Sequence, residues 1–131
     1  MLVRISLMVL RLCVLLAVIL GILFWLSILT PAGVLLSVHE TLGVLVVVTL
    51  WIIGAMLFLR GGSNIGPAIA AILWGALVLF VGLRQETLLP GSWHWVIQVA
   101  HLLLGLGAAG IGEMCAARYR GSRWQRLKAR L

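Results

Sequence analysis

The chain has 131 residues, of which 63% are hydrophobic and only 10% are charged, and its mean hydropathy is +1.22. Soluble domains are about 45–50% apolar and about 25% charged, so this chain has too few polar side chains to cover a water-exposed surface. The composition therefore excludes a soluble enzyme, a disordered chain and a nucleic-acid-binding domain. It predicts an integral membrane protein that lies mostly within the lipid bilayer.

Long uncharged stretches predict an all-α fold of four transmembrane helices. About 20 apolar residues span the hydrocarbon, and lipid requires that backbone groups be bonded within each segment. The predicted spans cover residues 8–30, 34–59, 65–84 and 92–116, and a basic tail covers residues 118–131. Arg4 and Arg11 precede an apolar run, as in a signal peptide. However, the uncharged run is longer than the about 7–15 residues of a signal core, so we expect a retained helix.

Turn-forming residues separate the predicted spans at 30–33, 60–64 and 89–92, where Pro, Gly, Ser and Asn gather. Ser92 is the expected N-cap of the fourth helix. Because all three connections are short, successive helices should be antiparallel neighbours, which predicts an up-down-up-down bundle.

Lys and Arg predict the orientation. Arg4, Arg11, Arg60 and six residues between Arg118 and Arg130 fall on one side, and only Arg84 falls on the other. The positive-inside rule then places both termini in the cytoplasm, with the basic tail on anionic lipid, and we expect a bacterial inner (plasma) membrane.

The same orientation assigns the aromatic residues and the cysteines. We expect an outer aromatic belt and an inner aromatic pair. The belt comprises Phe24, Trp25, Trp93 and Trp95, and the inner pair comprises Tyr119 and Trp124. Cys13 and Cys115 fall near the reducing inner face, so we expect small buried hydrophobes and no disulfide.

Two histidines fall within the predicted spans, where ionisable residues are costly and indicate function. His39 follows Pro31 by eight residues and His101 follows Trp93 by eight, which places each about 12 Å below its helix start. Since the second and fourth helices of such a bundle are diagonal neighbours, the two side chains should meet in the core near the outer face. Neutral imidazole ligates haem iron, so this pair is a candidate bis-histidine haem b site.

A glycine follows each histidine at i+4, on the same helix face: Gly43 after His39 and Gly105 after His101. The missing side chains would leave room for a porphyrin edge, and the repeated H-x-x-x-G pattern suggests a weak internal duplication. The competing interpretation is structural. Glycine also serves helix packing in membranes, and a buried histidine can donate to a backbone carbonyl on another helix.

Two further residues are weaker candidates for the same site. His94 lies seven residues before His101 and is either a belt residue, a haem-propionate partner, a quinone contact or a replacement ligand. Arg84 either pairs with a propionate or pairs with Glu86 and faces water.

The acidic residues within the spans have structural and functional interpretations. Glu40 either carries protons at a quinone site or bonds to a neighbouring helix or outer water. Glu113 lies near the inner end of the fourth span, where Arg11 or Arg60 could neutralise it.

The four-helix topology and the segments around His39 and His101 resemble the membrane b-type cytochromes, and also one half of haem A synthase. In those families, histidines on two helices ligate haem b, which implies ligand roles for His39 and His101. The Glu-x-x-x-His signature of haem A synthase is absent from the corresponding helix, so the resemblance implies no synthase chemistry.

We therefore predict a b-type cytochrome or cytochrome-like subunit, within a larger membrane complex or a homo-oligomer. It would pass single electrons between a quinol or a membrane dehydrogenase and an outer acceptor. No G-x-S-x-G, Walker A or HExxH motif favours a stand-alone enzyme. One alternative is a haem-free accessory subunit whose histidines are hydrogen-bonding packing residues. Another is a small proton-coupled transporter that uses Glu40, Glu113 and the histidines as a proton path.

Overall fold

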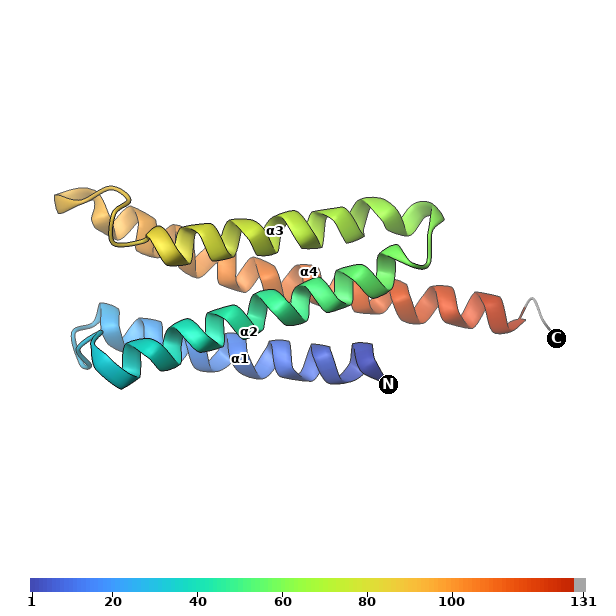
Figure 1. Cartoon of the computed structure of the whole chain (residues 1–131), viewed down its shortest axis with the longest axis horizontal. Coiled ribbons are helices and arrows are strands. Elements are labelled where there is room, and N and C mark those ends of the chain that lie inside the picture. Colours follow the sequence, from blue (N-terminus) through green and yellow to red (C-terminus); the bar gives the residue numbers. More distant parts are fainter. Residues whose placement is uncertain (129–131) are drawn as a thin grey trace.

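The chain forms four long helices, seen here in a computed structural model that describes residues 1–128 and the side chains as far as Ser122. They are α1 (Leu2–Trp25), α2 (Gly33–Phe58), α3 (Ile65–Arg84) and α4 (His94–Lys128) (Figure 1). The short 3₁₀ turns η1 (Gly62–Asn64) and η2 (Gly91–Trp93) precede α3 and α4. The predicted all-α class is confirmed. Each of the four long helices is long and apolar enough to cross a membrane, which fits the predicted membrane protein.

The helix boundaries differ from the prediction at both ends of the chain. α1 ends at Trp25 rather than at residue 30, because Ser27 has a left-handed backbone (φ 56°) that a right-handed helix cannot contain. The predicted N-cap role of Ser92 is wrong, since this residue lies inside η2 and α4 begins at His94. No proline interrupts the basic segment, and α4 continues into it to Lys128 without a break. The remainder of the predicted tail, residues 129–131, lies outside the described residues.

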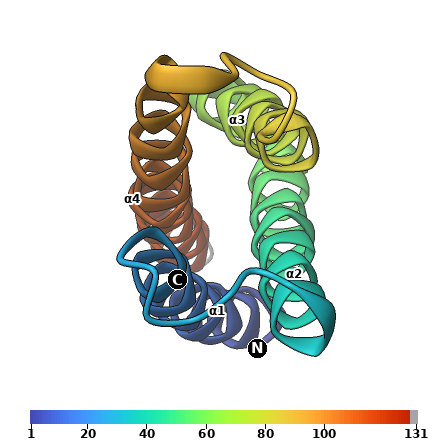
Figure 2. The same cartoon turned by 90° about the vertical axis from the view of Figure 1, so that its left-hand side faces the viewer.

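The connections divide the bundle into two ends. Residues 26–32 and 85–93 form what we call the loop end, whereas the start of α1 and the α2–α3 turn lie at the opposite end (Figure 1). Viewed from the loop end, the helices follow one another around the bundle in sequence order (Figure 2). α2 packs against both of its sequence neighbours and also contacts α4 across the diagonal.

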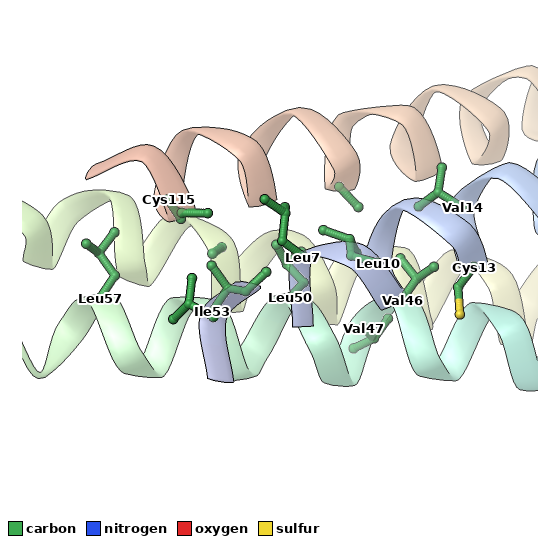
Figure 3. Packing of buried hydrophobic residues seen from close by; sticks show 14 of the residues in the cluster. Leu7, Leu10, Cys13, Val14, Val46, Val47, Leu50, Ile53, Leu57 and Cys115 are labelled. Atoms are coloured by element: carbon green, nitrogen blue, oxygen red, sulfur yellow. The ribbon is translucent and has the colours of Figure 1, made fainter. Parts of the chain in front are cut away.

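On α1, α2 and α4 the buried residues lie only in the half of the bundle away from the loop end, whereas α3 also buries Val78 and Val81 toward the loop end. Among the described side chains, α1 buries none beyond Val14, α2 none before Val46 and α4 none before Ala108. Within the core, leucines and valines from α1 and α2 pack together with Cys115 of α4 (Figure 3). Cys13 and Cys115 are buried and free, as expected for small apolar residues. The other half, which contains the candidate histidines, is much less tightly closed.

Glycine brings α2 and α3 close together in the core. A Cβ on Gly54 would lie 3.2 Å from the Ala71 Cβ, and one on Gly75 would collide with the indole of Trp51. The same Trp51 indole donates its Nε1–H to the backbone carbonyl of Ile72 on α3 at 3.0 Å. This half of the bundle therefore combines close backbone approach with a directional bond between helices.

An ion pair joins α1 to α4 within the spans. The Arg11 Nε donates to Glu113 Oε1 at 2.5 Å. Of the two partners predicted for Glu113, Arg11 and Arg60, the structure therefore pairs it with Arg11. Arg60 lies instead over the ring of Tyr119, with its Cζ 4.2 Å from the ring centroid. The pairing lets two charged groups occupy an apolar segment with their charges neutralised.

Removing one member of this pair should therefore destabilise the bundle more than removing both. We expect Glu113→Gln, which leaves the Arg11 charge without its partner, to lower the unfolding temperature in detergent. The double variant Arg11→Gln/Glu113→Gln should recover most of that loss. Circular dichroism during heating measures the effect, with Arg4→Gln as a control at an exposed arginine of the same helix. A double variant less stable than Glu113→Gln would contradict this view of the pair.

Candidate functional site

The structure brings His39 of α2 and His101 of α4 together near the loop end. Their ring centroids are 6.3 Å apart, and the ring planes are inclined at 58°. The helices that carry them touch across the diagonal of the bundle. The proximity expected from their matched depths is therefore present.

Each histidine ring packs against a glycine on the preceding helix. A Cβ on Gly21 of α1 would lie 3.4 Å from His39 Cε1, and a Cβ on Gly82 of α3 would lie 3.1 Å from His101 Cε1. Neither glycine is among the residues predicted for the site from the sequence. Gly21 precedes His39 by 18 residues and Gly82 precedes His101 by 19, each across a short connection, and this near-equal spacing could have revealed them.

Phe24 also belongs to this site rather than only to the predicted outer belt. Its ring is half-buried and meets His39 edge-on, with 5.7 Å between the ring centroids and 68° between the planes. Trp25, Trp93 and Trp95 are exposed, as residues of an aromatic belt would be. Phe24 therefore helps to fix the ring of His39.

Both histidines have a buried nitrogen that forms no hydrogen bond within the described part of the chain, namely Nδ1 of His39 and Nδ1 of His101. A buried polar atom without a partner costs about 1–3 kcal/mol, so such an atom calls for an explanation, such as a bound ion or ligand. The His39 ring also interacts with the backbone of Ala17, so a purely structural role for this histidine would explain one of its polar interactions. A purely structural role does not explain why the Nδ1 atoms of both histidines are buried without a hydrogen-bond partner.

The Cβ positions of Gly43 and Gly105 are open. No heavy atom lies within 4 Å of the position that a Cβ would take on Gly43 or on Gly105, apart from each glycine's own local backbone. Both glycines are half-buried and stand one turn after a histidine on the same helix face. A larger side chain at either position would therefore meet no described side chain within 4 Å of its Cβ.

The remaining candidates lie around this pair without joining it. Arg84 ends α3, two residues after Gly82; it is exposed and forms no ion pair with Glu86 or with another described side chain. His94 begins α4 and makes no ring contact with the pair in the described structure. Glu40 is exposed beside His39.

The donor set fits a haem better than a bare metal ion. Among the described residues, no group of three or more His, Cys, Asp or Glu side chains could hold a metal. A haem iron already has four porphyrin nitrogens and takes its remaining ligands from the protein. Two imidazoles bound on opposite sides of one metal at about 2.0–2.1 Å have ring centroids roughly 6 Å apart, and the rings of His39 and His101 are 6.3 Å apart.

No protein-family model matches the chain, and the searches of curated proteins and of solved structures also find no match. The assignment of function therefore depends on the histidine pair, its two glycine contacts and the open Cβ positions of Gly43 and Gly105.

Proposed function

We propose that this protein is a membrane b-type cytochrome or a cytochrome-like subunit that carries single electrons through a haem b held between His39 and His101. The observation that supports the proposal most directly is the pair of rings 6.3 Å apart, each with a buried Nδ1 that lacks a partner. An electron-transfer role agrees with a site that offers two imidazoles as ligands for a haem iron.

The chain's own residues have defined tasks in this proposal. His39 and His101 would hold the haem iron, and the open Cβ positions of Gly43 and Gly105 would leave room for the macrocycle. Arg84 pairs with a propionate, and His94 contacts a propionate or a quinone closer to the water. The haem supplies one-electron chemistry when it is bound. The surrounding apolar helices limit water access and help to set its potential.

The proposal includes an orientation and a setting. In an up-down-up-down bundle with both termini in the cytoplasm, the histidines lie toward the outer face of a bacterial inner membrane. The asymmetric distribution of Lys and Arg supports this orientation. With so little polar surface, the protein works within the lipid bilayer as a homo-oligomer or as part of a larger membrane complex.

The first test is optical. Protein made with adequate haem supply and purified in mild detergent should give a reduced-minus-oxidised spectrum with the sharp α-band of six-coordinate low-spin haem b. A pyridine haemochrome assay should give about one haem per chain, as one bis-histidine site requires. A flat spectrum from well-folded protein would overturn the proposal and leave the histidines as packing residues.

A further inference from the structure

Trp74 ties α3 to α4 one turn away from His101. Its indole donates Nε1–H to the backbone carbonyl of Leu104 at 2.9 Å. Leu104 follows His101 by three residues, about 4.5 Å along the helix axis. A Cβ on Gly107 would collide with the same indole, so the ring fills a notch on α4 that exists because residue 107 is glycine.

The α3–α4 contact is reciprocal. α3 places Trp74 against Gly107 of α4, and α4 places the ring of His101 against Gly82 of α3. The two contacts lie in succession along one seam between the helices. A slide or rotation of α4 that displaced His101 would also have to break the Trp74 bond and move the indole out of its notch.

We propose that Trp74 is a positioning residue that fixes the height and rotation of His101 through the backbone of α4. The inference rests on the proposed function, because the position of His101 matters for how this residue would bind the haem iron. The route is mechanical: the indole holds the α4 backbone, and the α4 backbone carries the imidazole.

The chain offers a matched control. Trp51 makes the equivalent contact between α2 and α3, with its Nε1–H donated to the Ile72 carbonyl at 3.0 Å and its ring against Gly75. It is twelve residues from His39, about 18 Å along α2. Loss of this bond should therefore weaken the fold without changing the histidine geometry.

The test compares Trp74→Phe with Trp51→Phe and the wild type, all loaded with haem in detergent. Each substitution keeps an aromatic ring and removes one donor. We expect Trp74→Phe to shift the g values of the ferric low-spin signal in electron paramagnetic resonance. It should also speed haem transfer to apomyoglobin roughly tenfold, the lower end of the effect of outer-shell partners. Trp51→Phe should match the wild type in both readouts while lowering the unfolding temperature.

Two results would overturn the positioning role of Trp74 but leave the proposed function standing. One is Trp74→Phe with the g values and the haem-transfer rate of the wild type. The other is Trp51→Phe with the same change in g values and haem-transfer rate as Trp74→Phe. Failure of the proposed function looks different, because the wild type itself would then take up no haem, and the positioning role would fall with it.

Discussion

Replacing either His39 or His101 with alanine is expected to give a folded protein that has lost its haem b. In the proposed haem site, each substitution would remove one of the two ligands to the iron and leave a single imidazole to hold it. The fold should persist because neither imidazole is fully buried and each has a buried Nδ1 that contributes no hydrogen bond to the bundle. Haem per chain from the pyridine haemochrome assay, with circular dichroism for the fold, measures the outcome.

His94→Ala is the matched control, since His94 lies on the same helix as His101 but outside the pair. It should keep the wild-type α-band. Added imidazole provides a second control, because it can enter the space vacated in His39→Ala or His101→Ala and restore the low-spin spectrum. Alanine variants that retain a full complement of low-spin haem would show that other residues hold it, and the ligand assignment would be wrong.

The meeting of His39 and His101 could be predicted because it depends on quantities that the sequence contains. Helical rise fixes depth along each span, and turn-forming residues fix where each span begins. The partner of Glu113 could be narrowed to Arg11 or Arg60 for a similar reason, since a charge within an apolar span needs a neighbour of opposite sign at its own depth. Distances along the helix axis could therefore be predicted from the sequence.

The rotation of each helix about its own axis could not be predicted from the sequence. Most of the site contacts that were not predicted depend on this rotation. A helix that is apolar on every side gives no pattern that identifies its inner face. The contacts of Gly21 with His39, of Gly82 with His101 and of Trp74 with Gly107 all follow from how the helices turn toward one another. Phe24 was assigned to the aromatic belt for the same reason, because depth alone does not separate a lipid-facing ring from one that meets His39.

The two halves of the bundle have different structures, which suggests that one stabilises the fold and the other holds the candidate site. One half is closed by small residues, a core of leucines and valines, and the Trp51 bond. The histidine half has open space at the Cβ positions of Gly43 and Gly105, one turn after His39 and His101. A stable half can position ligands on the helices that extend from it, and rigid elements hold a site more accurately than loops do. Filling the space therefore gives a direct test of whether it has a function.

Gly43→Leu and Gly105→Leu should each abolish haem binding while leaving the apoprotein folded and at least as stable as the wild type. No heavy atom outside the local backbone stands within 4 Å of either Cβ position, so the larger side chain can be accommodated without displacing the bundle. Leucine also has a better helix propensity than glycine, by up to about 1 kcal/mol. A porphyrin edge could not share that space with an isobutyl group.

The matched control for these two variants is Gly110→Leu on α4, where the Cβ position is equally open but exposed on the outer surface. This variant should bind haem as the wild type does. Haem per chain and the unfolding temperature of the apoprotein in detergent measure both halves of the prediction. If the histidines served packing alone, all three variants would behave alike. Full haem binding by Gly43→Leu and Gly105→Leu would mean that the macrocycle, if present, lies elsewhere, because the open faces at i+4 would then have no part in holding it.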